Sequence, residues 1–245
     1  LPIYLRLCNR SLNMLNLKTP NKNNTSGYLG VYKVGNSYVA RVMVNYKNIH
    51  LGNFGDIGIL SFNGNKIITT GGGGMIVTDD EALAKRAKHL TTQAKSDSFE
   101  YIHDEIGYNY RLGNVAAAMG VAQMELLPEF LVRKKEIIAY YKKELFEVGD
   151  IQFQEVSEHV NPNWWMPTLF TSNQKVLLKT LNDNQLQSRP LWVPMNRLPM
   201  FKDEFYYHHN DQSYSLYQHC LSIPCSTHIK PEELQKVVET IQSVY

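Results

Sequence analysis

A single lysine in an apolar, glycine-rich stretch is the most chemically suggestive feature of the chain. Lys66 follows a buried-strand pattern at residues 57–62 and precedes an apolar run and four consecutive glycines, residues 71–74. An unpaired ammonium is costly to bury, so a lysine in these surroundings indicates an amine with a chemical task. Glycines let a backbone approach a ligand closely, and Ser61 offers a hydroxyl to an anion. We predict an activated lysine beside a phosphate site; a surface lysine next to a flexible glycine hairpin stays an open alternative.

Other chemical constellations are weak. The stretch is not a P-loop, because Asn65 separates Gly64 from Lys66 and neither Ser nor Thr follows the lysine. Two histidines and two cysteines near the C-terminus could be considered as zinc ligands, but this stretch fits a strand better, and we expect no metal site. These residues are His219, Cys220, Cys225 and His228.

Charge is distributed unevenly along the chain. Residues 1–53 hold no Asp or Glu and seven basic residues: Arg6, Arg10, Lys18, Lys22, Lys33, Arg41 and Lys47. Because the formal net charge of the whole chain is +2, the remainder carries −5. This asymmetry predicts two segments with different partners, the first of them polyanionic; a solvated basic tail is the alternative.

The elements that must position Lys66 fall into two groups. Three strand-like runs, residues 28–34, 37–45 and 48–54, precede it, and Gly35-Asn36 between the first two is typical of a tight hairpin. From Asp56 onward strands and helices alternate, which indicates an α/β fold. Helices are expected at residues 81–92, 115–127, 129–147, 174–182 and 231–244, with Pro128 ending the second, and further strands at 75–78 and 186–193.

Composition limits the class of protein. Hydrophobic residues make up 43% of the 245 residues and charged residues 20%, which suits a folded chain. No run approaches the ~20 apolar residues of a membrane span, so we expect none. Three cysteines are too few for a disulfide framework and fit a reducing compartment, and we expect a cytoplasmic protein. Because the chain begins at Leu1 rather than Met, we also expect a fragment.

Three separated blocks resemble one enzyme family. The first is Gly55-Asp56-Ile57-Gly58 with Ser61-Phe62-Asn63, Lys66 and the glycines; the second is residues 104–123; the third is residues 189–201. Together they resemble the DegT/StrS family of sugar aminotransferases, in particular members that serve bacillosamine or legionaminic acid synthesis. The resemblance implies an α/β, partial fold-type I aminotransferase. It would comprise part of a large domain at residues 54–128 and a small C-terminal α/β domain at residues 129–245.

The family resemblance also implies roles for individual residues. Lys66 would form the Schiff base with pyridoxal 5′-phosphate and carry the proton during transamination, which suits a buried lysine. Ser61 would bind the cofactor phosphate, and Asn109 would reach the phosphate of a neighbouring subunit in a homodimer. The substrates would be a keto-sugar nucleotide and an amino-acid donor, glutamate being expected. Members of this family place an aspartate against the pyridine nitrogen ahead of the lysine, and residues 1–53 contain none, so we expect impaired activity.

The front of the chain resembles a different family. Residues 23–31, 38–42 and 49–54 are similar to the three-stranded antiparallel sheet of an apetala/ethylene-response-factor DNA-binding domain. Residues 5–13 resemble the stretch that precedes such a domain in HNH homing endonucleases. By that resemblance Lys33, Tyr38, Arg41 and Lys47 would contact DNA weakly, since the helix that backs the sheet is missing. An alternative function is therefore a DNA-binding protein from a mobile-element fusion, with residues 1–53 active and the aminotransferase part inactive.

Overall fold

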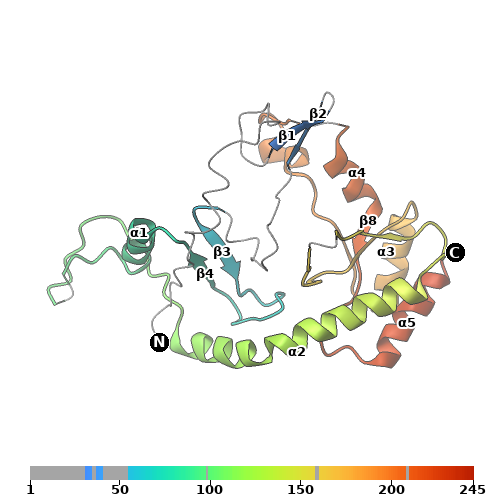
Figure 1. Ribbon diagram of the computed structural model, residues 1–245, viewed down its shortest axis with the longest axis horizontal. Coiled ribbons are helices and arrows are strands. Elements are labelled where there is room, and N and C mark those ends of the chain that lie inside the picture. Colours follow the sequence, from blue (N-terminus) through green and yellow to red (C-terminus); the bar gives the residue numbers. More distant parts are fainter. Residues whose placement is uncertain (1–30, 35–36, 41–54, 98, 158–159, 208–209) are drawn as a thin grey trace. The chain divides into compact units, whose positions relative to one another are not determined.

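The computed structural model describes residues 31–34, 37–40, 55–97, 99–157, 160–207 and 210–245 (Figure 1). The chain divides into two compact units, Leu1–Leu127 and Pro128–Tyr245, here called unit 1 and unit 2.

In the part of unit 1 that the structure describes there are two separate antiparallel hairpins. Strand β1 (Val31–Val34) pairs with β2 (Ser37–Ala40), so two of the three expected N-terminal strands are confirmed. The third, at residues 48–54, lies outside the described residues. Strand β3 (Gly58–Ser61) pairs with β4 (Gly74–Val77), and the loop between them carries Lys66 (Figure 1).

Helix α1 (Glu81–Thr91) begins as its sequence predicts. The Asp80 side chain accepts hydrogen bonds from the backbone N–H groups of Ala82 and Leu83, at 2.8 and 3.1 Å, which satisfies donors that a helix start leaves unpaired. Thr78 Oγ1 donates to the carbonyl of Asp56 at 2.6 Å. This bond joins the residue that follows β4 to a residue that precedes β3, just before α1 begins.

One continuous helix replaces the two that were expected around Pro128. Helix α2 runs from Asn114 to Glu144 with Pro128 inside it, so the prediction of a stop there is wrong (Figure 1). A proline inside a helix removes one hydrogen bond and costs about 3 kcal/mol. Packing outweighs that cost, because beyond the proline α2 buries Ile137, Ile138 and Tyr141 in unit 2.

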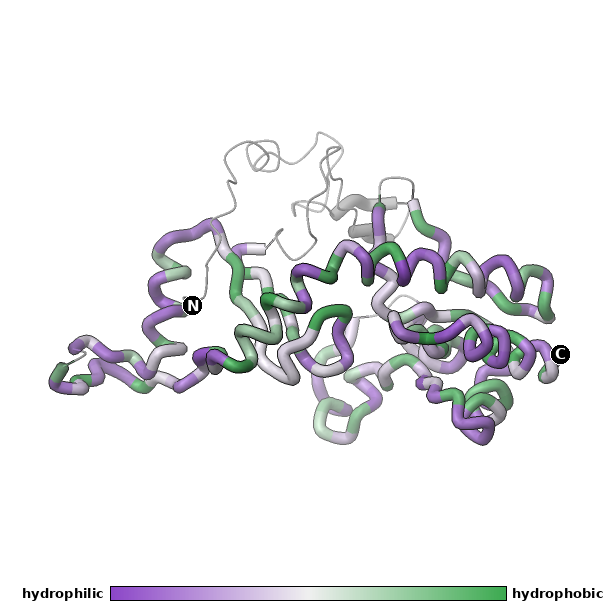
Figure 2. Tube along the Cα trace, turned by 90° about the horizontal axis from the view of Figure 1, so that it is seen from below, coloured by the Kyte–Doolittle hydropathy of each residue, from purple (hydrophilic) through white to green (hydrophobic). Residues whose placement is uncertain are grey.

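By length and composition α2 could also cross a membrane, with a mean hydropathy of 1.4 over 18 residues, whereas the sequence analysis expected no such segment. Buried core helices of soluble proteins meet the same criterion, but none of the apolar window of α2 is buried. In the second half of α2 hydrophobic and hydrophilic residues alternate along the helix (Figure 2). The buried face of its second half marks that part as a core helix.

Unit 2 is built around a small antiparallel sheet. Its strand order is β5 (Gln152–Phe153), β6 (Thr168–Phe170), β8 (Cys220–Ser222) and β7 (Arg189–Pro190). Helices α3 (Gln174–Asp183) and α5 (Pro231–Gln242) pack against one another and confirm two predictions. Further short elements, which the sequence analysis did not predict, are two 3-10 turns, Met195–Arg197 and Pro199–Phe201, and α4 (Gln212–His219).

The core of unit 2 consists of aliphatic side chains from α2, α3, α5 and the sheet. Fully buried members are Ile137, Leu169, Leu177, Leu181, Leu221, Val237 and Ile241. The strand expected at residues 186–193 shrinks to β7, Arg189–Pro190. Pro190 and Pro194 have no backbone N–H to donate, so this edge of the sheet cannot extend further.

Asp150 gives unit 2 a predicted dependence on acid. Its carboxylate accepts a hydrogen bond from the backbone N–H of Ser172 at 2.8 Å and others from the hydroxyls of Ser172, Thr171 and Tyr245. The bonds from Ser172, and then that from Thr171, hold the pKa of Asp150 well below its ordinary value. The stabilisation is therefore complete above the unfolded pKa of about 3.9 and is lost as the pH falls through the lower folded pKa.

Urea titrations measure the free energy of unfolding at each pH. As the pH falls below about 4, this free energy should decrease less in the D150N variant than in the parent. The D203N variant, altered at an exposed side chain, should behave like the parent; an equal acid loss in D150N and the parent would contradict this account.

Candidate functional site

The loop between β3 and β4 holds Lys66 in a defined backbone conformation. We call residues 58–77 the lysine hairpin. The N–H of Lys66 donates to the carbonyl of Asn63 at 2.9 Å, which closes a turn, and the lysine is half-buried. Across the base of the loop the N–H of Phe62 donates to Gly73 at 3.1 Å, and the N–H of Thr70 donates to Phe62 at 3.0 Å. The lysine is thus presented by a closed, hydrogen-bonded loop.

The glycine run has a structural task within this hairpin. Gly71 and Gly73 have φ values of +80° and +84°, which side chains rarely tolerate. Gly74 pairs directly with Ser61, and a Cβ on it would lie 2.6 Å from the carbonyl oxygen of Leu60. At least three of the four glycines are therefore needed to form the hairpin, whatever ligand it binds.

Alanine at position 74 should destabilise the lysine hairpin. The added methyl group meets backbone that cannot move away cheaply, and overpacking of this kind costs about 1–3 kcal/mol. Gly72 supplies a matched control, because a Cβ there meets nothing within 4 Å. Urea unfolding should show a loss for G74A and little change for G72A. Equal stability of the two variants would contradict the close approach at Gly74.

One polar contact lies within the hairpin and another joins the hairpin to α2. The Ser61 hydroxyl accepts a hydrogen bond from the N–H of Asn63 at 3.3 Å. The side-chain oxygen of Gln123, on α2, accepts one from the N–H of Thr69 at 3.3 Å. The sequence analysis gave Gln123 no role, although a polar residue in a helix of small and apolar residues was a usable signal. Gly120 permits the close contact, since a Cβ there would lie 2.9 Å from Thr70 Cγ2.

The chemistry of the hairpin suits an anionic ligand with an electrophilic carbon. Lys66 is the only charged residue between Asp56 and Asp79. With Ser61 it provides a hydroxyl and an amine five residues apart, and no carboxylate of the hairpin competes with them. This donor set fits a phosphorylated aldehyde, which needs hydrogen-bond donors for the phosphate and an amine for the carbonyl.

Asn109 lies on a different segment of unit 1. It forms an antiparallel bridge with Thr92 at the end of α1, and its side chain is exposed. On either side the N–H of Tyr108 donates to Leu90 at 2.7 Å and the N–H of Tyr110 donates to Thr91 at 3.0 Å. The structure therefore places Ser61 and Lys66 on one hairpin and attaches Asn109 to the C-terminal end of α1.

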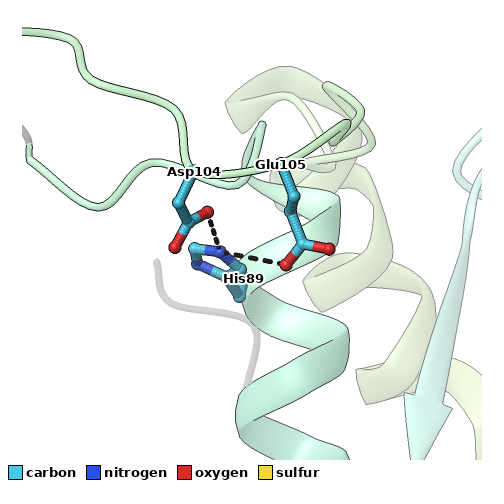
Figure 3. Close-up of side chains that lie close together, drawn as sticks. All are labelled: His89, Asp104 and Glu105. Atoms are coloured by element: carbon cyan, nitrogen blue, oxygen red, sulfur yellow. Dashed lines mark hydrogen bonds and ion pairs between the residues drawn. The ribbon is translucent and has the colours of Figure 1, made fainter.

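A histidine and two carboxylates form a cluster that the sequence analysis missed (Figure 3). His89 Nε2 lies 2.7 Å from Asp104 Oδ1 and 3.4 Å from Glu105 Oε1, and the three ligand atoms could hold a metal ion. Arg86 Nη2 also donates to Glu105 Oε2 at 2.6 Å, and this pairing lowers the pKa of Glu105. Because Arg86 already binds Glu105, we interpret the cluster as an ion-pair network that holds the loop after α1. His89 and Asp104 are fifteen positions apart in sequence, so only the folded loop brings them together.

The other residues considered in the sequence analysis belong to other elements. His219 Nδ1 lies 2.8 Å from the carbonyl of Ser215, and Cys225 contacts Lys134. Within the described residues, the group able to hold a metal does not include these two. Lys33 and Tyr38 are directly opposite in the β1–β2 register. Arg41 and Lys47 lie outside the described residues.

Comparison with known proteins identifies similar sequences. The model of the DegT/DnrJ/EryC1/StrS aminotransferase family matches residues 41–242 and so begins before residue 54. EpsN of Bacillus subtilis is 35% identical over 206 residues, which cover 82% of this chain and 53% of EpsN. A GDP-perosamine synthase of Escherichia coli O157:H7 is 35% identical over 203 residues, covering 82% of this chain and 55% of the synthase. The chain thus spans about half the length of the curated relatives it matches.

Solved structures show the same fold. The aminotransferase TlmJ from Streptoalloteichus hindustanus superimposes with a TM-score of 0.73 at 21% identity, over 78% of this chain and 53% of TlmJ. Helicobacter pylori PseC, an aminotransferase of pseudoaminic acid biosynthesis, gives 0.72 at 21% identity, over 82% of this chain and 56% of PseC. The architecture is therefore part of the fold-type I aminotransferase fold. With the family match over residues 41–242, the chain belongs to the DegT/DnrJ/EryC1/StrS aminotransferase family.

Proposed function

We propose that this chain takes part in pyridoxal phosphate-dependent transfer of an amino group to a keto-sugar nucleotide, with Lys66 as the cofactor lysine. The observation that carries the proposal is the lysine hairpin. It presents one half-buried lysine, five residues after Ser61 on the same hairpin, in the part of the chain that the family model matches. This assignment supports the activated-lysine interpretation over a surface lysine without a task.

Three side chains would hold the cofactor. Ser61 would donate a hydrogen bond to the phosphate of the cofactor, and the Lys66 amine would bond the aldehyde carbon of the same cofactor. Asn109 would donate a hydrogen bond to the phosphate of the cofactor held by the neighbouring subunit. When bound, pyridoxal phosphate supplies an aromatic ring that withdraws electrons from the carbon losing its proton. Lys66, freed from the aldehyde when an amino acid takes its place, would carry that proton as a general base.

The substrate class is supported by the relatives. Besides the perosamine synthase, a UDP-4-amino-4,6-dideoxy-N-acetyl-beta-L-altrosamine transaminase of Helicobacter pylori is 25% identical over 209 residues. Both names describe amino sugars carried on a nucleotide. A nucleotide-linked keto-sugar acceptor is therefore the best candidate, with a bacillosamine or legionaminic acid type of product and glutamate as the amino donor.

A homodimer would complete the site. The first half of α2 exposes apolar side chains, of which Val115 is 84% exposed and Met124 53%. In the segment before α2, Ile106 is 81% exposed and Tyr110 69%. Apolar residues exposed in such numbers are typical of a surface that packs against another protein surface. A second copy of the chain is the occupant that the family resemblance implies.

A single-turnover reaction tests this proposal. The 245-residue chain, loaded with pyridoxal phosphate, is mixed with glutamate, and conversion of the cofactor to its amine form is followed by absorbance. We expect conversion to be detectable but far slower than the 1–10³ s⁻¹ that is ordinary for enzymes. The chain spans half of its relatives, and residues 1–53 offer no carboxylate for the ring nitrogen. Conversion at an ordinary rate would contradict the impairment, and failure to convert at all would contradict the function.

A second candidate function rests on the charge of the first 53 residues. Seven basic and no acidic side chains favour a polyanionic partner, and Lys33 pairs with Tyr38 in the β1–β2 hairpin. We propose weak, non-specific DNA binding by this segment through Lys33, Tyr38, Arg41 and Lys47. Retention on DNA should fall steeply as salt rises. Retention that is unchanged between low and high salt, or sequence-selective at physiological salt, would contradict it.

A further inference from the structure

A buried lysine of unit 2, which has no role in the proposed function, lies against a cysteine. Lys134, on α2, is 5% exposed. Its Nζ donates to the carbonyl of Cys225 at 2.6 Å and to that of Trp165 at 3.2 Å, and it lies 3.3 Å from Cys225 Sγ. Among the described residues, none of the ion pairs includes Lys134. The nitrogen is therefore held by neutral acceptors, directly beside a sulfur atom.

The cysteine is held in place and can be reached from solvent. Cys225 follows β8 and is half-buried, so a small oxidant has access to it. The preceding carbonyl, of Pro224, accepts a hydrogen bond from the buried Tyr141 hydroxyl at 2.7 Å, and Cys225 Sγ donates to the carbonyl of Trp165 at 3.4 Å. Tyr141 lies two turns along α2 from Lys134. The same helix therefore positions the lysine nitrogen and, through Tyr141, the backbone next to Cys225.

Cys220 offers a comparison within the same unit. It lies in β8, is 6% exposed, and burial raises its pKa. A buried thiol that stays protonated reacts slowly with oxidants, because the thiolate is the nucleophile. The two cysteines therefore differ in accessibility and in their neighbours, although they are only five positions apart in sequence.

From this geometry we propose that Lys134 and Cys225 form an oxidation-driven covalent nitrogen–sulfur link, a modification site separate from the cofactor lysine. A peroxide oxidises the Cys225 thiol by two electrons to the sulfenic acid and is itself reduced to water. The Lys134 ammonium releases a proton to solvent, its nitrogen attacks the sulfur, the sulfur–oxygen bond breaks, and a second water leaves. Sulfenic acids are known to condense with a backbone nitrogen to a sulfenamide, and here the lysine nitrogen takes that place. One peroxide is consumed, and the product is a neutral sulfenamide that a thiol reductant can reverse.

The link would act on a cavity wall. Lys134 Nζ binds the carbonyl of Trp165, and Trp165, with Trp164 and Trp192, lines a cavity of about 380 Å³ in unit 2. When Nζ bonds to sulfur it loses its charge and two of its three donor hydrogens. One hydrogen would then serve the carbonyls of both Cys225 and Trp165, so oxidation at Cys225 would alter the wall of this cavity.

Peptide mapping of the peroxide-treated full chain tests the proposal. All proteins carry C8S, because Cys8 lies outside the described residues and could form a disulfide. After treatment with hydrogen peroxide, digestion at glutamate gives residues 130–136, with Lys134 and Lys135, and residues 205–232, with both cysteines. We expect these two peptides to be joined, with about 2 Da less than their sum, since two hydrogens are lost overall. Fragmentation should place the link at Lys134 and Cys225, and dithiothreitol should release it.

Three variants sharpen the test. C225S should abolish the joined peptides, C220S should retain them, and K134R should leave Cys225 free to oxidise to the sulfinic acid without a link. If a variant fails to fold, the digest of the parent protein still tests the proposal, because it either contains the joined peptides or does not. Sulfinic acid at Cys225 in the parent without joined peptides would overturn the proposal, as would a link through Lys135 or Cys220.

Discussion

Replacing Lys66 with alanine should abolish covalent capture of pyridoxal phosphate and lower the rate of amino transfer from glutamate by at least about 10²–10⁴-fold. The variant loses the amine that bonds the aldehyde and the base that moves the proton, and general base catalysis alone is worth that factor. Ser61 and the backbone of the hairpin remain, so weak non-covalent binding of the cofactor should persist. Absorbance of the loaded protein and the single-turnover rate measure the two losses separately.

Lys85 provides the matched control for that substitution. It lies on α1, its side chain is 76% exposed, and it pairs with Glu81 one turn away. K85A should retain both covalent capture and the parent rate. A K66A variant that still captured the cofactor covalently and reacted at the parent rate would show that another lysine carries the chemistry.

Leu177→Ala should have the largest effect on stability. Leu177 is fully buried on α3, within the cluster formed by α2, α3, α5 and the sheet. Truncating a buried leucine removes apolar contacts and leaves a cavity, which costs about 2–5 kcal/mol in the free energy of unfolding. Urea denaturation of the full chain measures this loss when it is monitored by the fluorescence of the tryptophans, which all lie in unit 2.

The neighbouring residue on the same helix separates packing from helix propensity. Val176 is 56% exposed, so V176A removes little buried surface and should leave the urea midpoint almost unchanged. Similar midpoints for L177A and V176A would mean that α3 does not pack as described.

Features set by local sequence could be predicted. The start of α1 follows from Asp80, which caps it, and the start of α5 follows from Pro231 with Glu233 behind it. The β3–β4 hairpin follows from an apolar run and glycines whose conformations other residues tolerate poorly. Ser61 and Lys66 lie on one hairpin because they are neighbours in sequence.

Features set by contacts between distant residues could not be predicted. Helix α2 passes through Pro128 because Ile137 and Tyr141 are buried beyond it, which no local pattern around the proline reveals. Residues 15 or more positions apart form the His89–Asp104 pair and the Lys134–Cys225 contact. Gln123 acts on the hairpin from 54 residues away, so its role emerged only from the folded structure.

The most direct test of the account asks which amine holds the cofactor. The chain is incubated with one equivalent of pyridoxal phosphate, reduced with borohydride to fix the cofactor on the amine that it occupies, digested, and mapped by mass spectrometry. The same treatment of K66A measures non-specific labelling of surface lysines. The account predicts one dominant modified residue, Lys66, and no dominant site in the variant. A parent protein labelled mainly at another lysine, or labelled no more than K66A, would contradict the assignment of Lys66 as the cofactor lysine.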